Sequence, residues 1–185
     1  MKPNILLTII ILLICGCKNS NYVDRQQKFK QFDFSYNDFF TTCFSIKFTN
    51  GDTVFIRQHW ASISDSLKIN QNYFGILKYT ERQKLDSFLD KTKFASYDSL
   101  YYEPYEDGEY YQFHFVNDTI NKLVFIHSDS IPIELKNLAY WIVKTKKNLK
   151  HHLADTLTDF KNLKFFLKPV ADPPLINKYT RPRVE

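Results

Sequence analysis

The amino-acid sequence predicts an α+β fold in which an antiparallel sheet carries two helices on one of its faces. Two stretches alternate apolar and polar residues on either side of a turn, and each is followed by a stretch with helical spacing. The composition agrees, because 17 Phe and 12 Tyr stand against only 4 Gly, and aromatic residues favour strands. The expected order is two or three strands and a helix, then two strands and a helix, and a further strand near the C-terminus.

The first hairpin is predicted around the Asn50-Gly51 pair. Phe44, Ile46 and Phe48 alternate with polar residues before it, and an apolar run follows at 54–56. Asn and Gly both tolerate the positive φ of a tight primed turn, so this pair between two strand patterns is a strong hairpin signal.

An extended stretch at 73–79 leads to the first helix, which is predicted over about 81–92. Thr80 and Gln83 have the spacing of a capping box, which marks the start of a helix. The apolar residues of the stretch recur at helical spacing and give one buried face, made by Leu85, Phe88 and Leu89.

The second hairpin and helix repeat this pattern. Tyr111, Phe113 and Phe115 alternate with polar residues, and an apolar return strand follows at 123–126. Pro132 marks the start of the second helix, because proline is tolerated in the first helical turn. Four residues give this helix its apolar face: Leu135, Leu138, Ile142 and Leu149. The two cycles suggest an internal repeat, although hairpins of this kind share such patterns without duplication.

The chain divides into four predicted segments. Residues 1–16 form a signal peptide, and residues 17–38, rich in Asn, Gln, Lys and Ser, form a tether. Docking of its phenylalanines on the domain is the alternative for part of this tether: Phe29, Phe32 and Phe34. A single folded domain is expected over 39–168, with a last strand or short helix at 160–167. Four prolines in residues 169–185 predict an extended tail.

The N-terminal segment has the anatomy of a signal peptide. Lys2 is followed by an apolar run at 5–14, which only Thr8 interrupts, and then by Gly16 and Cys17. This run is about half of the roughly 20 residues that a membrane-spanning helix needs. We therefore expect it to be removed.

The residues Ile14, Cys15, Gly16 and Cys17 resemble the lipobox of bacterial lipoproteins. The resemblance covers this segment alone, and a plain secretory signal that ends in cysteine is the alternative. It implies cleavage before Cys17, a diacylglycerol on the Cys17 thiol and an acyl chain, such as palmitate, on the new amine. More than one acyl chain makes attachment to the membrane effectively permanent. Lys18, rather than Asp, favours the outer membrane, on the extracytoplasmic side.

Charge and cysteine content limit the function further. The net charge of +5 is spread along the chain, so no nucleic-acid-binding stripe is indicated. Beyond the signal peptide and Cys17 the only cysteine is Cys43, which cannot form an internal disulfide. Because Phe44 follows it, we expect Cys43 to be a small buried hydrophobic residue.

The most distinctive candidate site is the stretch 98–111, where tyrosines interleave with carboxylates around a proline and a glycine. Tyrosine offers a large, rigid apolar ring with a polar tip, and for that reason it is enriched in binding surfaces. We expect a partner-binding surface that includes Tyr101, Tyr102, Tyr105, Glu106, Asp107 and Tyr110. The alternative is a connecting loop whose tyrosines cover the core.

The sequence shows little sign of an enzyme active site. It has no nucleophile elbow, phosphate loop or dinucleotide fingerprint. His114 and His127 lie on opposite strands of the second hairpin, where they could be neighbours. With Cys43 or Asp129 they could form a nucleophile and base. Adjacent His151 and His152 point about 100° apart on a helix and cannot share one metal ion, so we expect neither a metal nor a cofactor.

The sequence thus favours a membrane-anchored, non-catalytic domain that binds a protein or an envelope component, for example as an inhibitor or immunity protein. A periplasmic hydrolase that uses Cys43 or a histidine is the alternative.

Overall fold

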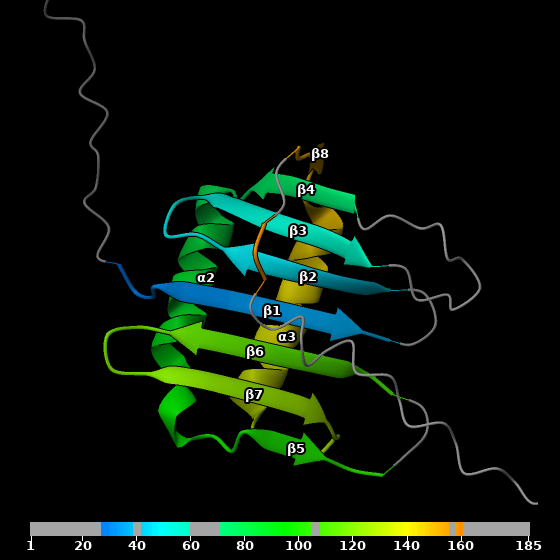
Figure 1. Ribbon diagram of the computed structural model, residues 1–185. Helices are drawn as coiled ribbons and strands as arrows, with labels where there is room; N and C mark the ends of the chain where they lie inside the picture. Colours follow the sequence, from blue (N-terminus) through cyan, green and yellow to red (C-terminus); the bar gives the residue numbers. More distant parts are fainter. Residues whose placement is uncertain (1–26, 39–41, 60–70, 105–107, 156–157, 161–185) are drawn as a thin grey trace, which may run out of the picture.

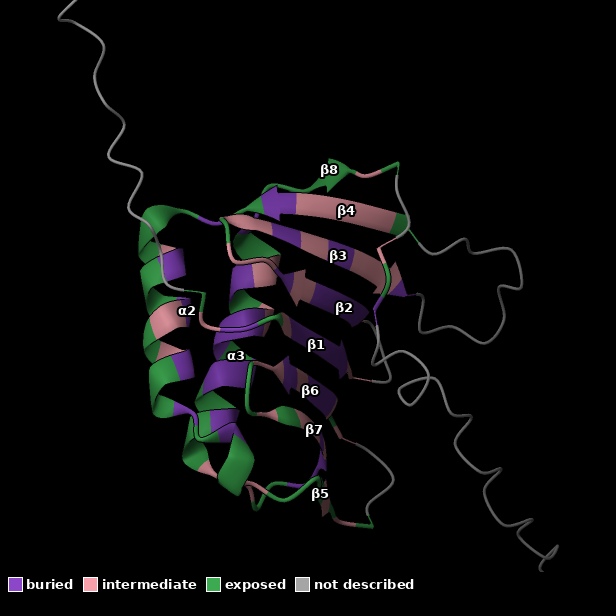
Figure 2. Cartoon of the chain, turned by 60° about the vertical axis from the view of Figure 1, so that its left-hand side comes forward, coloured by how far each residue is buried: buried purple, intermediate pink, exposed green. Residues whose placement is uncertain are grey.

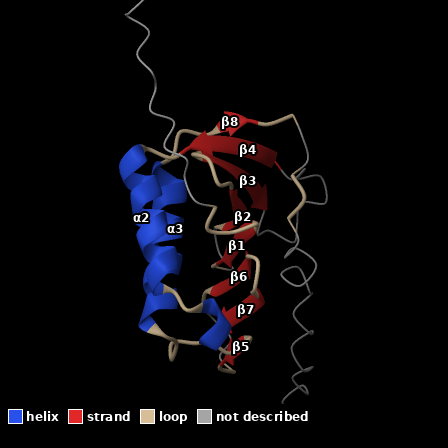
Figure 3. Cartoon of the chain, turned by 90° about the vertical axis from the view of Figure 1, so that its left-hand side faces the viewer, coloured by secondary structure: helices blue, strands red, loops and turns tan. Residues whose placement is uncertain are grey.

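An eight-stranded sheet with two helices on one face forms the domain (Figures 1 and 3), and the α+β prediction is therefore confirmed. The computed structural model describes residues 27–38, 42–59, 71–104, 108–155 and 158–160. The signal peptide, the lipobox and the tail at 169–185 lie outside these residues. The strands lie in the order β5-β7-β6-β1-β2-β3-β4-β8, and all neighbours are antiparallel except β5 and β7.

The helices and strands follow the predicted order, with additional strands. The strands are β1 (Gln31–Asn37), β2 (Cys43–Phe48), β3 (Thr53–His59), β4 (Gln71–Ile76), β5 (Leu100–Tyr102), β6 (Tyr110–Val116), β7 (Asn121–His127) and β8 (His152–Leu153). The helices are α2 (Tyr79–Lys91), α3 (Ile133–Asn148) and the short 3₁₀ helix η1 (Phe94–Ser96). The C-terminal strand is β8, and most of the stretch predicted at 160–167 lies outside the described residues.

The central strand of the sheet is β1, which lies between β2 and β6. We expected residues 17–38 to form a tether, and for Gln31–Asn37 that prediction is wrong. Phe32 and Phe34 are fully buried against the helices, and the polar residues that alternate with them, Asp33 and Ser35, are also fully buried. The folded domain therefore begins before residue 39, because β1 pairs with β2 and with β6 at the centre of the sheet.

The core lies between the sheet and the helices, where the buried residues of both gather (Figure 2). Aromatic rings from β1, β2 and β6 pack against one another there. Phe32 pairs with Phe48 on one side and with Phe115 on the other. Phe34 likewise lies between Ile46 and Phe113. The two hairpins thus present equivalent residues to β1.

The helix starts differ in detail from the prediction. The carboxylate of Glu81 accepts a hydrogen bond from the backbone N–H of Lys78 (2.7 Å), so the first turn of α2 is not capped by Thr80 and Gln83. Pro132 precedes the first residue of α3 as its N-cap. In the first hairpin Gly51 does not adopt a positive φ, because a four-residue connection replaces the tight primed turn. There the Thr49 hydroxyl donates to the Thr53 carbonyl (2.6 Å).

The second face of the sheet carries many polar side chains in its central strands, and there it is not fully open to solvent. Residues 158–160 cross it over β2 and β3 (Figure 1). The Lys47 ammonium donates to the Asp159 carbonyl (3.0 Å), and the Arg57 guanidinium donates to the Thr158 carbonyl (2.8 Å). The same guanidinium lies 5.0 Å from the centre of the Phe160 ring, which is buried. This segment covers part of the face opposite the helices.

Candidate binding surface

One edge of the sheet is formed by β5, a three-residue strand that pairs in parallel with β7. Successive side chains of a strand point to opposite faces, so Tyr101 points toward the helices while Leu100 and Tyr102 point to the other face. Leu100 is 61% exposed and Tyr102 is 57% exposed. Large apolar side chains are therefore presented at this edge.

A contiguous apolar surface extends inward from β5. Leu100 pairs with Phe125 of β7, and the Phe125 ring centre lies 5.8 Å from that of Tyr110 on β6. Phe125 and Tyr110 are half-buried. We call the surface formed by Leu100, Tyr102, Tyr110 and Phe125 the β5 patch. It lies on the face of the sheet away from the helices.

Two of its tyrosines are held in place by His127, a buried residue of β7. The Tyr110 ring stacks on the imidazole at 3.7 Å between centres with an interplanar angle of 9°, and the Tyr102 ring lies 5.5 Å from it. Rings that are fixed by stacking lose little further conformational entropy when a partner binds. The β5 patch is therefore preorganised.

Glu103 connects the end of β5 to the segment between β7 and α3. Its carboxylate accepts hydrogen bonds from the Ser128 hydroxyl (2.9 Å) and the Asp129 backbone N–H (3.4 Å). The bond from Ser128 lowers the pKa of the Glu103 carboxyl, so this side chain is charged at neutral pH.

A cavity of about 680 Å³ lies between the C-terminal end of β1 and α3. Tyr36 and Tyr111 form part of its apolar lining, whereas Glu109, Asp129 and Lys136 supply charged groups. The Tyr36 hydroxyl donates to the Glu109 carboxylate (2.5 Å). Burial, together with this hydrogen bond and the nearby negative charge, raises the pKa of Tyr36.

Acidic residues flank β5 in the sequence. Between residues 98 and 111 there are five carboxylates and no Lys or Arg: Asp98, Glu103, Glu106, Asp107 and Glu109. The whole chain has a net charge of +5, so this segment has the opposite sign.

The structure separates the residues that we predicted for the binding surface. Tyr102 and Tyr110 belong to the β5 patch. Tyr101 instead packs against the core, and its hydroxyl accepts a hydrogen bond from the Asp98 backbone N–H (3.1 Å). The remaining predicted residues lie outside the described part of the chain: Tyr105, Glu106 and Asp107. Sequence reasoning missed Leu100 and Phe125, which only strand pairing brings together.

The candidate catalytic residues are not assembled into a site. We expected His114 and His127 to be cross-strand neighbours, and that prediction is wrong. His114 pairs with Leu123, which lies four residues along β7 from His127. Cys43 is buried, with 3% of its surface exposed. Burial, helped by the charge of Asp38, raises the pKa of its thiol to about 12. A protonated, inaccessible thiol is a poor nucleophile.

Ser45 and His59 form a hydrogen-bonded pair in the buried polar layer of the sheet. Ser45 Oγ lies 3.1 Å from His59 Nε2 and 2.7 Å from Ser35 Oγ. All three side chains are at most 4% exposed. These contacts satisfy polar groups in the interior, where an unpaired group would be costly.

Within the described ranges no three His, Cys, Asp or Glu side chains are grouped so that they could hold a metal ion. His151 lies beyond α3, where its Nε2 is 3.0 Å from the Lys146 carbonyl. His152 belongs to β8, and its ring stacks on Phe74.

The thiol of Cys43 is expected to make the domain less stable in alkali. Unfolding returns its pKa from about 12 to its ordinary 9.0, so above pH 9 only the unfolded state loses this proton, and stability falls as the pH rises. Relative to Cys43→Ala, we expect the protein to lose an additional 1.6 kcal/mol, roughly, between pH 9 and 10.5. Urea unfolding of both proteins, each also carrying Cys15→Ser and Cys17→Ser, measures this difference. Equal slopes would contradict the burial of the thiol.

Comparison of the chain with protein-family models, curated proteins and solved structures found no match. Among the residues that the structure describes, none forms a helix long and apolar enough to cross a membrane.

Proposed function

We propose that the protein is a bacterial lipoprotein whose folded domain binds a protein partner through the β5 patch. The lipobox resemblance at Ile14, Cys15, Gly16 and Cys17 supports an anchor on the extracytoplasmic side of the membrane, and Lys18 favours the outer membrane. A rigid surface suffices for such a role, as it would for an inhibitor or immunity protein.

The observation that carries this proposal is the exposed apolar surface at the edge of the sheet. Leu100 and Tyr102 are both more than half exposed, and acidic residues flank them in the sequence. Exposed apolar patches with a polar rim are typical of protein-interaction sites. Tyrosines at the centre of such patches often contribute much of the binding energy.

The alternative, a hydrolase that uses Cys43 or a histidine, receives less support from the geometry. Cys43 and His127 are buried, and His114 hydrogen-bonds through both ring nitrogens, to Gln31 and Asn121. These residues do not converge on an accessible cavity.

Photocrosslinking in cells tests the proposal. A photoreactive phenylalanine at position 102 should give an adduct with one protein partner, because this side chain lies in the β5 patch. The matched control is position 79, because Tyr79 is 65% exposed at the start of α2. This helix start follows β4, which lies near the opposite edge of the sheet. We expect no adduct there.

The anchor is tested in the same experiment. Cys17→Ala should move the protein out of the membrane fraction, because it removes the acylated thiol, and the adduct at position 102 should be lost with it. Equal adducts at positions 102 and 79, or none at 102, would contradict binding through the β5 patch. Retention of Cys17→Ala in the membrane would contradict the anchor.

A further inference from the structure

The outer edge of β5 has backbone groups available for another strand. The inner edge bonds to β7, since the Phe125 N–H donates to the Ser99 carbonyl (2.9 Å) and the Glu103 N–H donates to the His127 carbonyl (2.7 Å). Hydrogen-bonding direction alternates along a strand, so the backbone groups of Leu100 and Tyr102 point away from β7. No strand in the described part of the chain pairs with this outer edge.

The three residues of β5 lack most of the usual protection against strand addition, although the strand is short and Glu103 and Pro104 follow it directly. Natural edge strands carry charged residues, proline or bulges that prevent another chain from pairing, but β5 reads Leu-Tyr-Tyr. The opposite edge differs, because the two residues of β8 follow Lys150 and His151, which are both exposed. The β5 edge is short, yet it is the more apolar and the less protected of the two.

Charge defines the partner that fits this edge. Asp98 precedes β5 and Glu103 follows it, and the stretch 98–111 contains only acidic charges. A strand that pairs with β5 would place alternate side chains beside Leu100 and Tyr102, where apolar groups are favoured. The side chains near the carboxylates would be basic.

We infer that β5 accepts an extended segment of the partner as an additional strand, and that this segment alternates apolar and basic residues. The inference rests on the proposed function and names the class of segment that the β5 patch binds. Main-chain hydrogen bonds would then provide affinity and the alternating side chains specificity, as in other cases of strand addition.

Hydrogen exchange tests the inference with a synthetic peptide of ten residues that alternates valine and lysine. The full chain carrying Cys17→Ala is used with residue-resolved detection. Binding should slow exchange of the Leu100 and Tyr102 amides by about tenfold or more, because these two N–H groups gain partners. The Glu103 amide, which already donates to His127, is the internal reference and should not change.

Three control reagents separate backbone pairing from side-chain contact. Leu100→Pro removes an outward N–H without removing a bond to β7, and proline is tolerated at such edge positions. Leu100→Ala removes the same side chain but retains the N–H. We expect Leu100→Pro to bind the peptide about tenfold more weakly than Leu100→Ala. A valine-glutamate peptide should not bind.

Equal affinities of Leu100→Pro and Leu100→Ala, or binding without protection at Leu100 and Tyr102, would overturn strand addition. Failure of the valine-lysine peptide to bind, or equal binding of the glutamate peptide, would overturn the assignment of the segment. These results leave the crosslink at position 102 unaffected, so the inference can fail while the proposed function stands. The proposed function is contradicted instead by the crosslinking outcomes given above, such as the absence of an adduct at position 102.

Discussion

Replacing Phe113 with Ala is expected to lower the free energy of unfolding by about 3–5 kcal/mol. The Phe113 side chain is fully buried in β6. Its ring centre lies 5.0 Å from that of Phe34 and 6.1 Å from that of Phe94. Truncation leaves a cavity in the centre of this aromatic layer, and the surrounding rings, fixed on β1, β6 and η1, can close it only in part.

Urea unfolding followed by circular dichroism measures the effect. Phe113→Leu retains much of the apolar volume and should cost only about 1.5 kcal/mol, which keeps the comparison possible if the alanine variant does not fold. Tyr140→Ala is the surface control, because Tyr140 is 71% exposed on α3, and its effect should stay within about 0.5 kcal/mol. If Phe113→Ala cost less than Tyr140→Ala, this aromatic layer would not be the core.

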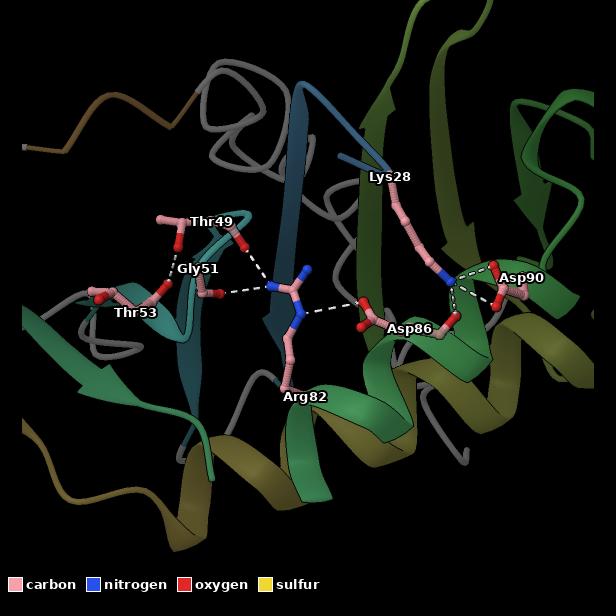
Figure 4. A network of polar contacts seen from close by, with 7 residues as sticks. All are labelled: Lys28, Thr49, Gly51, Thr53, Arg82, Asp86 and Asp90. Carbon is pink, nitrogen blue, oxygen red and sulfur yellow. Dashed lines mark hydrogen bonds and ion pairs between the residues drawn. The ribbon is translucent and has the colours of Figure 1, made fainter. Parts of the chain in front are cut away.

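Replacing Arg82 with Met is expected to cost about 3 kcal/mol, because its buried guanidinium holds α2 to the first hairpin. It donates hydrogen bonds to the carbonyls of Thr49 (2.7 Å) and Gly51 (2.6 Å), and its Nε lies 3.2 Å from a carboxylate oxygen of Asp86 (Figure 4). Arg82 is 3% exposed. Met fills a similar volume but leaves these acceptors without their donor.

The same network contains a matched control. Lys28 pairs with Asp90 at 2.6 Å, but this carboxylate is 63% exposed (Figure 4), so Lys28→Met should cost only about 0.5 kcal/mol. Arg82→Lys should fall between the two, because an ammonium cannot reproduce the planar fork of the guanidinium. Denaturant unfolding ranks the three variants. Equal effects of Arg82→Met and Lys28→Met would contradict the role of burial.

The alternating patterns around Asn50-Gly51 and Asn117 were enough to predict both hairpins, and helical spacing was enough to predict α2 and α3. These elements could be predicted locally, because consecutive residues carry the period of each strand or helix. Even so, the turn at Gly51 and the first turn of α2 differ from the prediction. Turn geometry depends on tertiary contacts such as those of Arg82 with Thr49 and Gly51.

Strand β1 shows where local patterns fail. The polar residues Asp33 and Ser35 between its phenylalanines suggested a solvated tether, yet both are fully buried. Their burial depends on the position of β1 between two hairpins that lie far apart in the sequence. Strand β5 could not be predicted for a related reason, because three residues are too few to show a period and its parallel partner is distant.

For the candidate site, the sequence alone located the tyrosine-rich, acidic stretch at 98–111, because composition and charge do not depend on the fold. The tertiary structure decided which of its side chains are available. Pleating directs Tyr101 into the core and Tyr102 outward, and pairing with β7 and β6 adds Phe125 and Tyr110. A binding surface is a set of neighbours in space, and non-local strand pairing determines which residues those are.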